Sequence, residues 1–481
     1  MLACALVLGG AAFLLRRLGP AAGERDFFTA SGALPAWAVA LSFAASEASA
    51  MTVLGVPAAA FREDWRYLQF FAGSAAARVA IALWLLPTLR AGGALTAFAW
   101  LEGRFGPGTR RWAGGAFVSA RFLLTAVRLM AAAAALSVVA GAPPAAWLAV
   151  LAVFAAGAAA WGGLRGAAYL GAAQTAFLIA GGAVLALYAG VVLEGGPFEA
   201  LRAADTAHKL AVWRFWPEGG LLRGMFVDRA WAPAALAGGL VGSMAAFAGD
   251  QEMMQGALHA PGDAGRRGLI GSAFAALTLL VVYLGLGSAL WAYYDHNTAL
   301  ALPDAPESIL PHFAVQNAGR WASQLVAALL VAAVMDLPLV GLAAVLLDDL
   351  GLRGRFAQPE DSPVPARAAA AASAVLIALA AAAAFGRPGF SAFAARFATA
   401  AYAPVLGLVL YGRFGPRRAS AGAVPALATA TLFALVLLTL EARSASPKGW
   451  HWAPLLTAAA AAGLTHFLAR GEAVSSHSRR A

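Results

Sequence analysis

The chain has little of the charge that a soluble protein carries. Only 12% of its 481 residues are charged and 61% are hydrophobic, whereas soluble domains have about 25% charged residues. This balance excludes a soluble globular protein and a disordered one. Cys4 is the single cysteine, which excludes an intrachain disulfide and a cysteine-rich metal site.

Lysine is also scarce, and the common enzyme signatures are missing. Lys209 and Lys448 are the only lysines among 34 basic residues, and the net charge is +10. Such a charge is typical of nucleic-acid-binding proteins, but the arginines here lie between apolar segments, where they set membrane topology. We therefore expect no nucleic-acid partner. The sequence has no P-loop, HExxH or GxSxG pattern, so we do not expect an enzyme.

Long apolar runs are what the sequence has instead. A helical span needs about 20 apolar residues, and about 13 segments of this kind can be drawn. They are residues 1–15, 36–61, 67–89, 113–140, 145–163, 168–192, 231–256, 268–294, 317–347, 367–386, 390–412, 421–442 and 451–469. These runs predict an all-α multi-pass protein of the plasma (inner) membrane, with the lipid bilayer as a partner. The first segment lacks a preceding basic region, which favours an uncleaved span.

The arginines also predict an orientation. Most of those in short loops follow odd-numbered segments, beginning with Arg16 and Arg17, and arginine-rich short loops face the cytoplasm. The N-terminus is then expected outside the cell and the C-terminus inside. The longest loop, 193–230, is expected to form an external cap, and the basic 89–112 loop is expected at the inner interface.

Glu47 lies near the middle of the second segment. A charged group at mid-bilayer costs about 2.5–3.5 kcal/mol on insertion scales, so it points to a functional role. Its neighbours are hydroxyl residues and helix breakers: Ser46, Ser49, Thr52, Gly55 and Pro57. This pattern predicts an unwound helix that lines a polar cavity. The alternative is a structural ion pair, for which Arg121 or Arg128 is the expected partner.

The seventh segment has a similar interruption. Gly238 and Gly242 form a GxxxG pair, which indicates close helix packing, and Ser243 follows them. Asp250 and Glu252 are expected near the inner end of this segment, where they would cap a helix or pair with arginine.

Two interrupted helices five spans apart predict two inverted five-helix repeats with broken first helices and a transport site between them. The repeats would be residues 36–192 and 231–412. Residues 1–35 form the first span and a cytoplasmic loop, 193–230 the extracellular loop, and 413–481 two C-terminal spans and a short tail.

Asp336 is a third buried charge, in the middle of the ninth segment. Pro338 follows it and is expected to kink that helix and free a backbone carbonyl. Two roles are open for Asp336. It is either a proton or cation ligand, or a cap for the kink.

Five stretches between about Asp26 and Asp349 resemble those of the sodium:solute symporter family, in the family's order. They are residues 25–37, 46–57, 100–106, 162–174 and 249–255. The chain departs from the family pattern at Gly171, where Asp is usual, and at Gly256, where Arg is common. The resemblance implies a leucine-transporter-type fold, with the solute bound between broken helices of two inverted repeats.

The resemblance also implies a sodium ion between segments 2 and 9. Its ligands would be the backbone carbonyls of Ala45, Ala48 and Leu330 and two hydroxyls. Those hydroxyl positions are Ala333 and Val334 here, so a Na+ site is possible but degraded. A buried carboxylate can bind a proton instead. We therefore expect no cofactor and a coupling ion that is Na+ or H+.

The resulting prediction is a secondary active transporter that moves a small solute by alternating access. The cavity would be lined by Ser46, Glu47, Ser49, Thr52 and Ser243, with Asp336 in the cation region. Large sugar contacts of the family are missing, which favours a smaller carboxylate or amino acid. One alternative is a proton-coupled or uncoupled transporter of the same fold. Another is a non-transporting membrane sensor that kept the fold.

Overall fold

The computed structural model describes residues 1–481 except 92, 94, 194, 218, 222–223, 226–227, 229, 357–358, 360, 416–421, 444–451 and 479–481. Within the described residues the regular structure is helical, without strands. In this described part of the chain, eight helices are long and apolar enough to cross a membrane, or nine if one sharply bent pair counts as a span. The predicted all-α, multi-pass class is therefore confirmed, while the expected number of about 13 spans stays a prediction.

The long helices follow most of the predicted segments. They are α1 (Leu2–Leu18), α5 (Tyr67–Ala80), α8 (Pro107–Ala140), α9 (Pro144–Val191), α14 (Ala264–His296), α18 (Val364–Ala384), α19 (Phe390–Phe414), α20 (Ala423–Arg443) and α21 (Ala453–Ser478). The shorter ones outside the breaks are α2 (Glu24–Thr29), α6 (Leu86–Arg90), α7 (Ala97–Phe105), α10 (Gly196–Thr206) and α15 (Ile309–His312). The predicted starts of the last two spans, at 421 and 451, lie outside the described residues.

The helix α9 covers two predicted segments and is divided at Gly163. A straight helix of 48 residues would be about 72 Å long at about 1.5 Å per residue, whereas the hydrocarbon core is about 30 Å thick. Gly163 has a φ of 50° and a ψ of −147°, outside the helical region. A side chain at this position would overlap the backbone of Phe27, so glycine permits both the break and the close contact.

Three other segments are broken into half-helices. The first gives α3 (Ala36–Glu47) and α4 (Ala50–Arg62), and the second gives α12 (Ala232–Gly249) and α13 (Gln251–His259). The third, predicted as one kinked span, gives α16 (Arg320–Ala332) and α17 (Leu339–Ala344), with residues 333–338 outside any helix. Polar side chains cap two restarts: Ser49 accepts from the Met51 N–H, and Asp250 accepts from the Met253 N–H.

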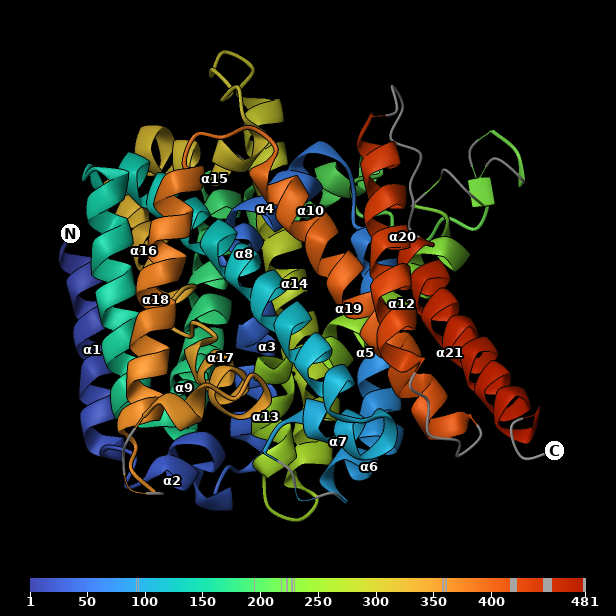
Figure 1. Cartoon of the computed structure of the whole chain (residues 1–481). Coiled ribbons are helices and arrows are strands. Elements are labelled where there is room, and N and C mark those ends of the chain that lie inside the picture. Colours follow the sequence, from blue (N-terminus) through green and yellow to red (C-terminus); the bar gives the residue numbers. More distant parts are fainter. Residues whose placement is uncertain are drawn as a thin grey trace.

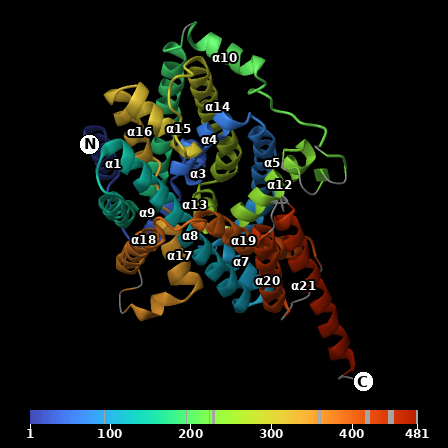
Figure 2. The same ribbon diagram turned by 90° about the horizontal axis from the view of Figure 1, so that it is seen from above.

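Two of the half-helices, α3 and α13, lie in the middle of the bundle. Viewed from above, α3 and α13 are central (Figure 2). Helices α1, α9, α16 and α18 stand together on one side, and α5, α12, α19, α20 and α21 stand on the other, in both views (Figures 1 and 2). Buried polar groups at the breaks are therefore enclosed by helices, which is where a membrane protein tolerates non-helical backbone.

Loops predicted on the same side of the membrane meet at the same face. The Glu24 N–H, at the start of α2, donates to the Asp361 carbonyl at 3.2 Å, and α2 lies in the lower part of Figure 1. At the opposite face, the Lys209 ammonium donates to the Phe61 carbonyl at 2.8 Å. This grouping agrees with the predicted alternation of loops. The assignment of the lower face to the cytoplasm stays a prediction.

Helices α5 and α12 approach closely through glycine. A Cβ at Gly73 would overlap the Leu236 carbonyl oxygen, and a Cβ at Gly239 would overlap that of Phe70. The close packing predicted for this segment is confirmed, but Gly242 of the predicted GxxxG pair takes no part in it, because a Cβ at Gly242 would have no atom within 4 Å. The spacing of glycines in the sequence did not show which face of α12 meets α5. The rotation of α12 against α5 places Gly239, and not Gly242, at the contact.

Candidate solute and cation site

Glu47 is the last residue of α3, and it forms an ion pair with Arg78 of α5. Arg78 is 1% exposed, whereas 28% of the Glu47 side chain is accessible. The other guanidinium contacts are to hydroxyls: Nε to Ser272 at 3.2 Å and Nη1 to Ser74 at 2.8 Å. The prediction that Arg121 or Arg128 would pair with Glu47 was therefore wrong. A buried carboxylate in the middle of one span reveals the need for a cation, but not which helix supplies it.

Aromatic rings complete the enclosure of Arg78. Its guanidinium carbon lies 5.7, 5.4 and 5.1 Å from the ring centres of Phe43, Phe71 and Phe247, within the range of cation–π attraction. Ser243 donates to the Ser74 hydroxyl at 2.7 Å and so belongs to the same cluster. Glu47 is therefore the accessible member of the pair.

The other predicted lining hydroxyls are engaged with the backbone. Ser49 and Thr52 form a capping box at the start of α4, in which Thr52 Oγ1 accepts from the Ser49 N–H at 3.2 Å. Ser46 donates to the Ser42 carbonyl at 3.2 Å. It also lines a cavity of about 20 Å³ that includes Glu252, large enough for one water molecule. These hydroxyls shape the break as well as lining it.

Asp250 occupies the break between α12 and α13. Its Oδ2 lies 3.1 Å from Nη1 of Arg121 and accepts from the Tyr402 hydroxyl at 3.1 Å. Asp250 is 2% exposed and Arg121 5% exposed. The predicted capping and arginine pairing of Asp250 are confirmed. The sequence placed Asp250 near the inner end of its segment. In the structure it lies at a break instead, since Glu252 and Met253 continue the chain as helix.

Asp336 lies in the break between α16 and α17 and is 6% exposed. Its carboxylate makes no hydrogen bond or ion pair with any residue that the structure describes. Its N–H donates to Oε1 of Gln174 at 3.3 Å. A Cβ at Gly171 would lie 2.8 Å from the Asp336 Oδ2, so this carboxylate fills the space beside a position where the family usually has an acid. The charges of Arg121 and Arg128 act on it.

Backbone carbonyls at the end of α3 meet a guanidinium. Nη2 of Arg128 lies 2.5 Å from the Ala48 oxygen and 3.4 Å from the Ala45 oxygen, and Nη1 lies 3.1 Å from that of Ser46. The amide nitrogen of Gln174 lies 3.4 and 3.5 Å from the Ala45 and Ala48 oxygens. Gln174 therefore connects this break to the one that holds Asp336.

The predicted cation residues come together only in part. The carbonyls of Ala45 and Ala48 lie at the break, where they accept from Gln174 and Arg128. Ala333 and Val334 are 0% and 1% exposed at the end of α16, and neither has a side-chain oxygen. The Val334 N–H donates to the Val331 carbonyl at 3.2 Å. Arg128 was predicted only as an alternative ion-pair partner of Glu47. Its contacts with the carbonyls of the break were not foreseen.

Ionic contacts tie the helix ends together at the lower face. Arg110, near the start of α8, contacts Glu102 at 2.7 Å and both Asp348 and Asp349 at 2.5 Å. Thr96 donates to Asp349 at 2.7 Å. Burial raises the pKa of Asp349 to about 6 against the effect of Arg110. These contacts link the α7–α8 region to the segment that follows α17.

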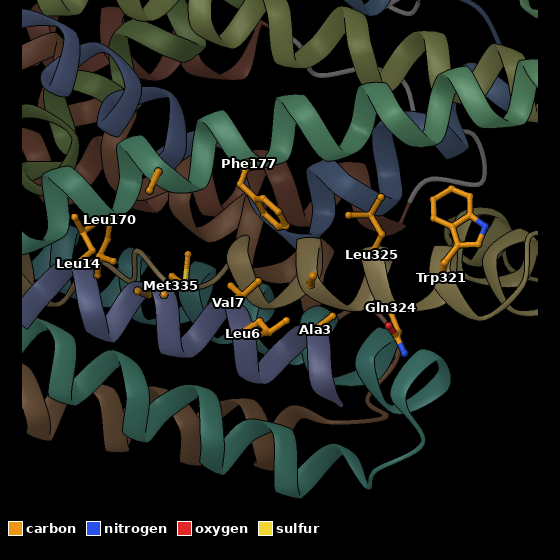
Figure 3. A pocket seen from close by; sticks show the side chains of 14 residues that line it. Ala3, Leu6, Val7, Leu14, Leu170, Phe177, Trp321, Gln324, Leu325 and Met335 are labelled. Atoms are coloured by element: carbon orange, nitrogen blue, oxygen red, sulfur yellow. The ribbon is translucent and has the colours of Figure 1, made fainter.

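A second, larger hollow lies between α1, α9 and α16 and has a volume of about 560 Å³ (Figure 3). Its lining is apolar apart from the polar ends of Trp321 and Gln324. The labelled side chains include Leu6, Val7, Leu14, Leu170, Phe177, Leu325 and Met335. None of the predicted site residues lines it. The predicted site residues thus lie at the central breaks and not at this hollow.

Solved transporters share this fold. A Na+-coupled sialic acid symporter, solved in a substrate-bound outward-open state, matches 97% of this chain and 96% of its own with a TM-score of 0.82 and 20% identity. Mhp1, a nucleobase-cation-symport-1 family transporter, matches 92% of this chain and 94% of its own with a TM-score of 0.53 and 14% identity. At these identities the likeness concerns the fold.

Sequence relatives are symporters of two kinds. The human sodium/iodide cotransporter is 31% identical over 204 residues, which cover 42% of this chain and 31% of the relative. The sodium/sialic acid symporter SiaT of Proteus mirabilis (strain HI4320) is 26% identical over 305 residues, covering 60% of this chain and 58% of the relative. The matched parts are thus less than two thirds of these relatives' own length. The sodium:solute symporter family model matches residues 27–429, well over half of the chain, and the chain therefore belongs to the sodium:solute symporter family.

Proposed function

We propose that this chain is a secondary active symporter that carries a small zwitterionic solute, such as an amino acid, and binds it beside Glu47. The observation that carries this proposal is the asymmetry of the Glu47–Arg78 pair. Arg78 is enclosed, whereas 28% of the Glu47 side chain is accessible, so Glu47 can meet a cationic group of the solute. The N-terminus of α4 adds a positive helix end, which suits a carboxylate.

The proposed lining of the solute site keeps the five predicted residues. Glu47 would bind the solute directly, and Ser243 would hold Arg78 in place through Ser74. Ser46, Ser49 and Thr52 would keep the α3–α4 break in shape. We propose that residues 36–192 and 231–412 are inverted repeats that move against each other in alternating access. We further propose that the N-terminus lies outside and the C-terminus in the cytoplasm.

We propose that the coupling cation binds at Asp336 and is a proton. The cluster around the breaks holds three carboxylates, of Asp250, Glu252 and Asp336, against the guanidinium groups of Arg121 and Arg128. The Asp250 carboxylate accepts hydrogen bonds from the Tyr402 hydroxyl and the Met253 N–H. The Glu252 carboxylate accepts one from the Gly341 N–H. The carboxylate of Asp336 has no such partner among the described residues. A proton satisfies it without the oxygen ligands that a sodium ion needs.

Uptake into proteoliposomes tests this function. A panel of amino acids and small carboxylates, with sialic acid included because two relatives carry it, is screened under either a pH gradient or a Na+ gradient. We expect concentrative uptake of a zwitterion under the pH gradient. We also expect that the Asp336→Asn variant loses accumulation but still exchanges the solute across the membrane.

Two results would contradict the proposal. Accumulation driven by Na+ at equal pH would assign coupling to sodium. The absence of uptake for every solute, in protein that melts cooperatively, would favour a sensor that kept the fold.

A further inference from the structure

The break between α3 and α4 creates a cation site that does not need a free ion. The last carbonyls of a helix have no partner within it and carry a partial negative charge. Here the Ser49 N–H, which would otherwise close the helix onto Ala45, bonds to the Thr52 hydroxyl instead. The Ala45 carbonyl is thus left open inside the bundle, where an unsatisfied polar group is costly.

Arg128 fills this site from α8. Its two terminal nitrogens donate to three carbonyls at the end of α3, those of Ala45, Ser46 and Ala48. Arg128 is 8% exposed, and no carboxylate forms an ion pair with it among the described residues. Backbone carbonyls, rather than a carboxylate, therefore receive this guanidinium.

A sodium ion does not fit the same place. The carbonyls of Ala45 and Ala48 are two of the ligands that the family resemblance assigns to Na+, and here they receive hydrogen bonds from Arg128 and Gln174. The hydroxyl ligands are replaced by Ala333 and Val334. A dehydrated cation needs oxygens in place of its water shell, and a second positive charge at these carbonyls is repelled by the guanidinium.

We propose that the Arg128 guanidinium is a tethered replacement for the sodium ion, so that the α3–α4 break binds no Na+. This inference rests on the proposed function, because it concerns the region in which that function places the coupling cation. It makes Arg128, together with the two missing hydroxyls, the determinant of ion specificity at this break.

The test measures sodium binding by the melting temperature of purified full-length protein in detergent. NaCl is the probe, and choline chloride at equal ionic strength is the control. Three forms are compared. They are the wild type, the double variant Ala333→Ser/Val334→Ser, which restores both hydroxyls beside Arg128, and the triple variant that adds Arg128→Ala.

We expect no sodium-specific change in the wild type or the double variant. The triple variant should show a saturable, sodium-specific rise of about 2 °C or more once NaCl exceeds its Kd about 100-fold. A purely structural role for Arg128 would lower the melting temperature of the triple variant without making it respond to Na+.

Either of two outcomes overturns the inference. One is a sodium-specific rise in the wild type or in the double variant, because Arg128 is present in both. The other is a folded triple variant that ignores Na+. If the triple variant does not fold, Arg128→Met with the two serines replaces it, since methionine keeps more of the side-chain volume. No uptake is measured, so failure here leaves the proposed solute transport standing, and failed uptake leaves this test intact.

Discussion

At the scale of single residues, the site is organised by charges that would be costly to bury alone. Arg78 is enclosed by three aromatic rings and two hydroxyls, and Glu47 is its charged partner. Removing one member of a buried pair typically costs about 3–5 kcal/mol, because the other charge stays behind without compensation. The pair therefore compensates both charges while part of the Glu47 side chain stays accessible, as the proposed solute site requires.

The Glu47→Gln substitution tests both roles. Because an amide still accepts a hydrogen bond but carries no charge, we expect a lower melting temperature and the loss of any stabilisation by the transported solute. The measurement is a thermal melt with and without that solute.

Glu63→Gln is the matched control. Glu63 is an exposed carboxylate at the end of α4, and a surface change of this kind usually alters stability by less than about 0.5 kcal/mol. If Glu47→Gln behaved like this control in both measurements, Glu47 would be neither a solute ligand nor a needed counter-charge.

At the scale of helices, close packing sets the register that brings these charges together. Gly73 and Gly239 let α5 and α12 approach until backbone meets backbone. That contact positions Ser74 of α5 against Ser243 of α12 at 2.7 Å. Since Ser74 also accepts from Arg78, the glycine contact and the ion pair belong to one packing unit.

The Gly239→Ala and Gly242→Ala substitutions compare two positions of one helix. A methyl group at 239 overlaps the Phe70 carbonyl, so we expect a loss of about 1–3 kcal/mol, as is typical of overpacking, and a lower melting temperature. A methyl group at 242 meets nothing within 4 Å, and alanine favours a helix over glycine by about 1 kcal/mol. That variant should melt at the same temperature or higher. Equal effects of the two substitutions would show that the α5–α12 contact is not as close as described.

At the scale of the whole molecule, the chain behaves as a bundle with two distinct loop faces. The lower face gathers Arg90, Arg104 and Arg110, which bind carbonyls or carboxylates near the ends of neighbouring helices. The opposite face carries the aromatic 193–230 loop, in which Trp216 is 84% exposed. Because arginine-rich short loops stay in the cytoplasm, we expect the lower face there.

Cysteine labelling tests this orientation, since Cys4→Ser removes the only cysteine. In that background, Trp216→Cys should react with a membrane-impermeant maleimide in intact cells. Arg267→Cys, at a side chain that is 70% exposed on the other face, should react only after the cells are permeabilised. The opposite pattern would invert the predicted topology, and labelling of both in intact cells would contradict it.

The sequence alone was sufficient for the membrane class, for the helix break near Glu47, for an interruption of the seventh segment, and for the family. Hydrophobic run length and the residues that stop a helix are local properties, so they can be read along the chain. The same holds for Ala333 and Val334, because a missing hydroxyl is visible in the sequence itself.

Only the tertiary structure decided which groups meet. Glu47 and Arg78 are 31 residues apart, and Arg128 is 80 residues from the Ala48 carbonyl that it binds. Spacing within one helix fixes which side chains share a face, but the rotation and depth of that helix against its neighbours come from packing. For this reason the sequence predicted Arg121 or Arg128 as the partner of Glu47. In the packed structure Arg78 pairs with Glu47 and Arg121 with Asp250. Arg128 binds the carbonyls of the break.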